Sequence, residues 1–225
     1  MSSIEPVRKD INRPNKIKKY SASLRLWHWA NTIVITGSLI TVLINSTVLN
    51  EGSNAAFIKD ALQKSGATVG ANQTRPLAGA LADKVWSVHI YFGYCLATLL
   101  LFRVILEFFQ LADQKLLRKI KTAYHDYFII KKRRKLARHE YVVKATYAAF
   151  YLLLLIMVVT GLTLAFKDQL PFAKATIHNV KSVHGFCMYL VLAFIVVHLA
   201  GVFLAERDES AGIVSDMING GRGKP

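Results

Sequence analysis

The sequence predicts an all-α integral membrane four-helix bundle with both termini on the cytoplasmic side. Hydrophobic residues make up 53% of the 225 residues, and they are gathered into blocks rather than spread along the chain. Four blocks reach the length of about 20 residues that a helix needs to cross a bilayer core of about 30 Å. We therefore expect one membrane domain over residues 1–225, with spans at Leu24–Leu49, Lys84–Phe108, Tyr141–Phe166 and Lys181–Ala205.

The distribution of basic residues predicts the direction of each span. The net charge is +15. Seven Lys and Arg residues lie at or before Arg25, eleven lie between Gln110 and Lys144, and three lie after Ala205. The loops after the first and third spans hold only four and three. Because cytoplasmic loops are rich in Lys and Arg, the loop 110–140 and the tail 206–225 are placed inside. The basic loop suits anionic lipid, and no nucleic-acid motif accompanies it.

The first span follows 23 polar and basic residues without a secretory cleavage pattern, so it is expected to be an uncleaved signal anchor. The outer loop 50–83 has a helix-like stretch at Ala55–Lys64, and loops of this length often bind partners. Cys95 and Cys187 fall within spans and form no metal-ligand pattern, so both are interpreted as packing residues.

Four histidines lie within the predicted spans, where ionisable side chains are costly and usually mark a site. His28 lies near the inner start of the first span, and His89 lies near the outer start of the second. His184 and His198 are fourteen residues apart in the fourth span, which separates them by about 21 Å along the helix axis. Two pairs at equal depth follow, His28 with His198 inside and His89 with His184 outside.

These pairs suit haem iron better than other metals. Imidazole binds iron, copper and zinc, but a structural zinc ion takes about four protein ligands. A haem needs only one or two axial ligands, and the interiors of helix bundles commonly hold such cofactors. We therefore expect two bis-histidine haems and no catalytic side chain, with a satisfied polar core or a proton path as the alternatives.

Two arginines are further candidates for cofactor binding. Arg25 lies three residues before His28 on the same helical face, where it either pairs with a haem propionate or anchors the span at the inner surface. Arg103 lies four residues before Glu107 near the inner end of the second span. This spacing predicts an ion pair, and a contact to a propionate or a quinone pocket is the alternative.

Several short motifs are distributed along nearly the whole chain. They are Arg25-Leu-Trp-His28-Trp, Val88-His89-Ile-Tyr-Phe-Gly93, Thr160-Gly161-Leu, the His184…His198 helix and the tail Gly212-Ile-Val-Ser-Asp-Met-Ile-Asn-Gly220. With these motifs the chain resembles the bacterial cytochrome b561 family, which includes the b-type cytochrome subunits of nickel-iron hydrogenases and formate dehydrogenases.

The resemblance implies a multi-pass cytochrome of the bacterial inner membrane that binds haem b through the four histidines. It implies that electrons enter from an outer-face metalloenzyme, a hydrogenase or dehydrogenase, at the His89/His184 haem. They would leave from the His28/His198 haem to a membrane quinone near Arg103. The protein would then be an electron-transfer subunit of an oxidoreductase complex in a respiratory chain.

Two other functions fit the sequence. The outer loop 50–83 is long for this family, and its basic residues could steer a small anion to a free-standing cytochrome that oxidises a donor such as superoxide and reduces quinone. In the second alternative the histidines bind no haem, and the bundle is a membrane anchor or a proton conductor.

Overall fold

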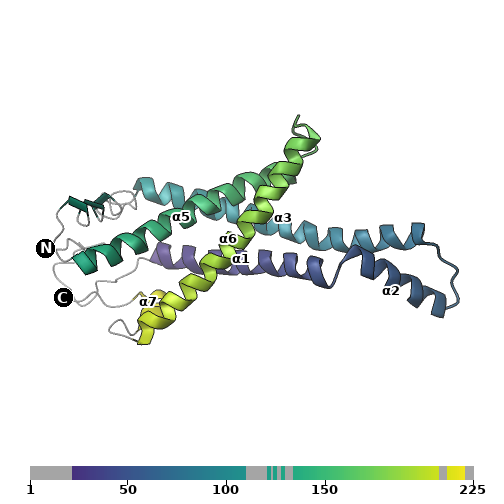
Figure 1. Ribbon diagram of the computed structural model, residues 1–225, viewed down its shortest axis with the longest axis horizontal. Helices are drawn as coiled ribbons and strands as arrows, with labels where there is room; N and C mark the ends of the chain where they lie inside the picture. The colour runs from purple at the N-terminus through teal and green to yellow at the C-terminus, as the bar shows by residue number, and fades with distance from the viewer. Residues whose placement is uncertain are drawn as a thin grey trace. The chain divides into compact units, whose positions relative to one another are not determined.

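The computed structural model describes residues 22–109, 121–122, 124–125, 128–129, 134–207 and 212–220. All regular structure in these residues is helical, which confirms the predicted all-α class (Figure 1). The helices are α1 (Ala22–Thr47), α2 (Glu51–Lys64), α3 (Ala71–Phe109), α5 (Arg134–Ala165), α6 (Lys174–Arg207) and α7 (Ile213–Asn219).

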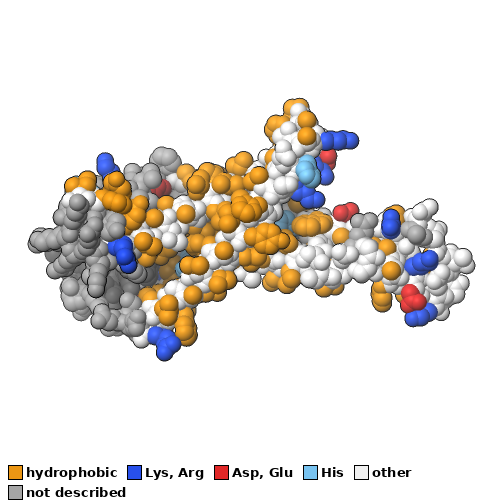
Figure 2. Space-filling view, viewed as in Figure 1, with side chains coloured by type: hydrophobic (Ala, Val, Ile, Leu, Met, Phe, Trp, Pro, Cys, Tyr) orange, Lys and Arg blue, Asp and Glu red, His pale blue; other side chains and the backbone are white. Residues whose placement is uncertain are grey.

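Four of these helices, α1, α3, α5 and α6, are long and apolar enough to cross a membrane. Their apolar side chains are largely exposed, and Figure 2 shows hydrophobic side chains gathered over α5 and α6. Val159 of α5 and Val196 of α6, for example, are 55% and 67% exposed. Extended apolar surfaces of this kind are typical of helices surrounded by lipid.

The helices extend beyond the predicted spans. The segment expected to be an outer loop begins at Asn50, whose side chain accepts hydrogen bonds from the backbone N–H groups of Gly52 and Ser53 and caps α2. The helix α3 begins at Ala71 rather than at Lys84. Once a helix is nucleated, each added residue gains a hydrogen bond at little cost, so polar residues continue a helix that hydropathy alone would end.

The chain forms two compact units. The first unit comprises residues 1–29 and 99–225, with the start of α1, the end of α3 and the helices α5, α6 and α7. Within it, α5 and α6 pack against each other, and Leu154 and Val191 are buried.

The second unit comprises residues 30–98, with most of α1, the helix α2 and most of α3. The Phe92 ring of α3 lies against Gly37 of α1, where an added Cβ atom would lie 2.4 Å from the ring. Any larger residue would displace the ring, so glycine at this position leaves space for Phe92.

Candidate cofactor site

The four histidines of the predicted spans are divided between the two units. His28 at the start of α1 and His184 and His198 of α6 belong to the first unit, and His89 of α3 belongs to the second. All four side chains are partly buried. The inner pair, His28 and His198, therefore lies within one unit. His184 has its neighbours in the first unit, and His89 has its neighbours in the second.

The rings of His28 and His198 face each other. Their centroids are 6.3 Å apart, and the ring planes are inclined by 55°. Two imidazoles on opposite sides of one metal, each bonded at about 2 Å, would have centroids about 6 Å apart. The described residues contain no cluster of three or more His, Cys, Asp or Glu side chains that could hold a bare metal ion. The pair therefore fits a haem iron, which needs only axial ligands.

Aromatic side chains surround this inner pair. Phe194, one turn before His198 in α6, lies parallel to its ring at 5.7 Å and 6°. Phe150 of α5 stacks on Phe194 at 4.0 Å and 14°. Trp29 meets the His28 ring edge to face at 5.2 Å and 89°. These contacts restrict the rotation of both imidazoles and bring apolar surface to the site.

His184 is oriented by a hydroxyl group of the neighbouring helix α5. Its Nδ1 lies 2.8 Å from Oγ1 of Thr160, and this hydroxyl donates its proton to the carbonyl oxygen of Ile156 at 2.6 Å. Because a hydroxyl has a single proton, Thr160 accepts a hydrogen bond from Nδ1–H of His184. The lone pair is then on Nε2, as in an imidazole that binds a metal.

Gly161 makes room for the same ring. A Cβ atom added at Gly161 would lie 3.2 Å from Cε1 of His184, closer than an ordinary van der Waals contact. Thr160 and Gly161 therefore act together on His184: the threonine supplies the hydrogen bond, and the glycine supplies the space for the ring.

His89 is held in the same way within the second unit. Its Nδ1 lies 2.9 Å from Oγ1 of Thr41, and Thr41 donates to the carbonyl oxygen of Ser38 at 2.6 Å. The same Nδ1 also lies 3.3 Å from that carbonyl oxygen, an acceptor that can pair only with a protonated nitrogen. Trp86 meets the ring edge to face at 5.4 Å. Nδ1 of His89 is thus protonated, and Nε2 is the nitrogen suited to bind iron.

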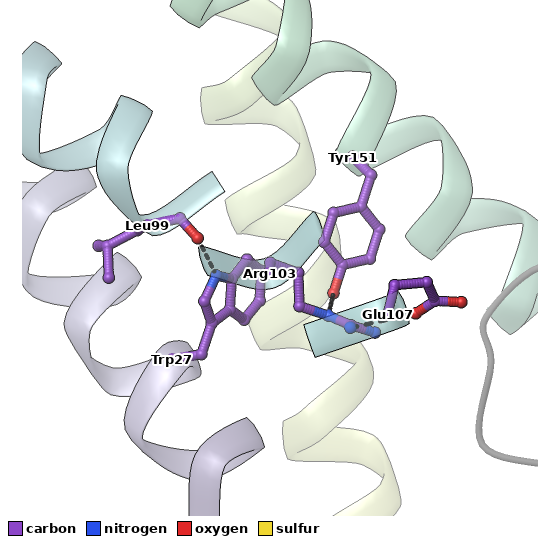
Figure 3. Close-up of polar contacts among 5 residues, drawn as sticks. All are labelled: Trp27, Leu99, Arg103, Glu107 and Tyr151. Carbon is purple, nitrogen blue, oxygen red and sulfur yellow. Dashed lines mark hydrogen bonds and ion pairs between the residues drawn. The ribbon is translucent and has the colours of Figure 1, made fainter. Parts of the chain in front are cut away.

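Arg103 belongs to a polar network in the first unit (Figure 3). Its side chain is buried, NH1 lies 3.1 Å from Oε2 of Glu107, and Nε donates to the Tyr151 hydroxyl at 3.0 Å. The predicted Arg103–Glu107 ion pair is therefore confirmed. Trp27 packs on the Tyr151 ring at 5.4 Å and donates from Nε1 to the carbonyl oxygen of Leu99 at 2.9 Å.

A groove of about 280 Å³ opens beside this network. Its exposed walls are almost wholly apolar, and the polar atoms of Arg103, Glu107 and Tyr151 lie behind that surface. The residues that line it are Leu100, Arg103, Val104, Glu107, Tyr151, Leu152 and Leu155. Small-molecule sites are mostly apolar with a small number of polar groups close by.

Arg25, the other predicted cofactor ligand, contacts the C-terminal helix. Its NH1 donates to the carbonyl oxygen of Ile218 in α7. The roles of Thr41 and Thr160 were not predicted, because hydroxyl residues are common in membrane helices and sequence spacing does not relate one helix to another. The Thr160-Gly161 motif was the only sign of this arrangement.

Comparison with known proteins identifies a family for the chain. A family model described as prokaryotic cytochrome b561 matches residues 19–220, which include the four spans, the four histidines and α7. Neither the comparison with curated proteins nor the comparison with solved structures gave a match. The family consists of membrane-bound b-type cytochromes, which implies haem b and electron transfer. With nearly its whole length matched, this multi-pass membrane protein belongs to the prokaryotic cytochrome b561 family.

Proposed function

We propose that this protein is a di-haem cytochrome that moves electrons between a redox enzyme at the outer face and membrane quinone in a respiratory chain. His28 and His198 would hold the inner haem iron, and His89 and His184 would hold the outer one. The observation that carries the proposal is the 6.3 Å spacing of the His28 and His198 rings. Bound haem b would supply the one-electron carrier, and the protein binds and orients it.

The chain's own residues orient the four imidazoles for this role. For His89 and His184, the hydrogen bonds from Nδ1 fix the tautomer and increase the basicity of Nε2. For the inner pair, stacking on Phe194 and the edge contact with Trp29 restrict the ring planes. The pairing of His89 with His184 rests on their equal depth in the sequence-predicted topology.

We place the quinone in the groove beside Arg103. Its apolar walls suit an isoprenoid tail, and the Tyr151 hydroxyl accepts a hydrogen bond from Arg103 Nε, which leaves its own proton to donate to a quinone carbonyl. Reduction of a quinone to a quinol takes up two electrons and two protons. Tyr151 carries a proton that it can pass on, whereas Glu107, a carboxylate in its ion pair with Arg103, would first take one up from solvent, which supplies both protons in the end. Trp27 joins Tyr151 to the turn that carries His28.

The first experiment measures haem. Purified full-length protein should give b-type bands in a reduced-minus-oxidised spectrum and two haems b per chain by pyridine haemochrome. The substitution His198→Ala should leave one, because iron loses an axial ligand. His178→Ala is the matched control, since His178 is an exposed histidine of the same helix. An absence of b-type bands, or two haems retained in His198→Ala, would contradict the proposal.

A second experiment addresses the quinone groove. Tyr151→Phe removes only the hydroxyl, and we expect quinone reduction to slow about tenfold or more, the size of a lost proton-transfer group, with haem content unchanged. Tyr147→Phe, one turn earlier in α5 and 44% exposed, should have no effect. An unchanged rate in Tyr151→Phe would exclude the groove as the reduction site.

A third experiment addresses the donor. The resemblance to hydrogenase and formate dehydrogenase cytochromes supports a large metalloenzyme partner, and purification in mild detergent should recover it with the cytochrome. Repeated recovery of the cytochrome alone, together with reduction of its haem by superoxide, would favour the free-standing cytochrome instead.

A further inference from the structure

The C-terminal helix α7 contacts the start of α1 on both sides of His28. Arg25 NH1 donates to the carbonyl oxygen of Ile218, and Trp29 Nε1 donates to that of Met217 at 3.2 Å. Both acceptors lie in the last turn of α7, where a helix has no N–H group of its own to pair with them. The negative end of the helix dipole also favours the Arg25 guanidinium there.

The other end of α7 is bound by Glu206, near the end of α6. Its Oε1 accepts from the backbone N–H of Gly212 at 2.8 Å, and its Oε2 accepts from that of Val214 at 3.4 Å. Gly212 and Gly220 have φ angles of 97° and 100°, which favour glycine and let the chain turn before and after α7. The helix that carries His198 is thus linked through α7 to the start of the helix that carries His28 (Figure 1).

Polar contacts hold α7 at both of its ends. The helix has seven residues, too few to be stable alone. Val214 and Ile218 are 42% and 61% exposed and Ile213 and Met217 are partly buried, so apolar packing supplies only part of its stability. The stretch that matches the family ends at Gly220, the C-cap of α7, so the matched region includes this helix.

We propose that α7 is a clasp that fixes His28 opposite His198, and that Arg25, Trp29 and Glu206 are positioning residues for the inner cofactor. His28 lies in the second turn of the described part of α1. Hydrogen bonds from the residues on either side of it to α7 hold that turn in place. The inference rests on the proposed function only in taking haem b as the group held between the two rings.

The sharpest test is Trp29→Phe, which removes the indole N–H and keeps an aromatic ring beside His28. In the full-length holoprotein, we expect retention of the inner haem to weaken about fivefold, the effect of one hydrogen bond, and its EPR g-values to shift. The inner haem is identified as the signal that His198→Ala removes. Trp86→Phe is the matched control, because Trp86 meets His89 at 5.4 Å and 87° as Trp29 meets His28 at 5.2 Å and 89°.

A double-mutant comparison separates the clasp from direct contact between Arg25 and a haem propionate. Removal of residues 212–225 should weaken the inner haem and leave the outer haem bound. Arg25→Gln should weaken the inner haem in the full chain and have no further effect in the shortened one, because coupled sites are not additive. An equal loss in both backgrounds would assign Arg25 to the cofactor and overturn the clasp.

Two further outcomes distinguish the proposals. If Trp29→Phe leaves the EPR signal and retention of the inner haem unchanged, the clasp is wrong even if the shortened chain fails to accumulate. A failed clasp would still leave two haems per chain in the unmodified protein. If His198→Ala instead retains two haems, the assignment of the inner ligands fails first.

Discussion

The inner and outer histidines are oriented by different physical means. His89 and His184 each bind a threonine hydroxyl through Nδ1, and that hydroxyl donates to a backbone carbonyl of its own helix. His28 and His198 lie against aromatic rings, with Trp29 at the edge and Phe194 in parallel. A hydrogen bond sets the tautomer and basicity of an imidazole, whereas aromatic packing restricts the plane of its ring.

This difference has a consequence for reduction potential. A more basic axial ligand stabilises the oxidised iron, and hydrogen bonding around a haem is one of the means by which proteins set its potential. We therefore expect the Nδ1–H hydrogen bonds to Thr41 and Thr160 to lower the potential of the haem held by His89 and His184. A lower potential there favours electron movement from the outer to the inner haem, the direction of the proposed quinone reduction.

The largest expected effect comes from removing the two hydroxyl groups. Thr41→Val and Thr160→Val keep side-chain shape and delete the partner of Nδ1, and loss of such partners typically weakens metal binding about 10-fold to 100-fold. Each should raise the potential of the same haem, measured by redox titration of the purified protein.

The matched control for this pair is Thr163→Val. Thr163 lies one turn after Thr160 in α5, is partly buried like Thr160, and donates to the carbonyl oxygen of Val159. If Thr41→Val and Thr160→Val change different haems, His89 and His184 do not share one iron, and the outer pairing is wrong.

A smaller effect is expected from Gly161→Ala. The added Cβ atom would lie 3.2 Å from His184, so the ring must move by a few tenths of an ångström. Overpacking of this kind costs about 1–3 kcal/mol, and the gain in helix propensity returns up to about 1 kcal/mol. The EPR signal of the outer haem should shift while that of the inner haem stays unchanged.

Gly79→Ala is the control for helix propensity, because a Cβ atom at Gly79 of α3 would meet nothing within 4 Å. If the outer-haem signal is identical in Gly161→Ala and in the unmodified protein, the His184 ring has more space than the 3.2 Å distance indicates, and this prediction is wrong.

The smallest effect is expected from Phe194→Leu. It removes the parallel stack on His198, which is worth about 0.5–1.5 kcal/mol, and leaves the apolar character of the position. Both haems should remain bound, with a broader EPR signal from the inner haem alone. Phe186→Leu, at a 63% exposed position of the same helix, should leave the spectrum unchanged. Loss of the inner haem in Phe194→Leu would contradict this prediction, because the Phe194 ring would then be needed for haem binding and not only to restrict the plane of the His198 ring.

The positions of the four histidines were predictable because their spacing is read along single helices. The 3.6-residue period and the rise per residue fix where His184 and His198 lie on one helix, and the apolar blocks locate the spans. The ion pair between Arg103 and Glu107 followed from the same local rule. The placement of both termini in the cytoplasm stays a prediction from the basic residues.

The ends of the helices were less predictable. Hydropathy marks where a helix leaves the apolar core, whereas backbone hydrogen bonding continues the helix into polar sequence. For this reason α3 begins at Ala71 rather than at Lys84, and α2 begins at Glu51, before the helix-like stretch predicted at Ala55–Lys64 and confirmed there.

The all-α membrane class and the four histidines within apolar spans follow from composition and helical periodicity, which are local properties of the sequence. The side chains that hold those histidines are set by tertiary packing. Thr160 bonds His184 from a neighbouring helix, and α7 bonds the start of α1 from almost two hundred residues away. Contacts of this kind depend on how each helix is rotated about its axis and how closely it packs, and one-dimensional spacing does not contain either quantity.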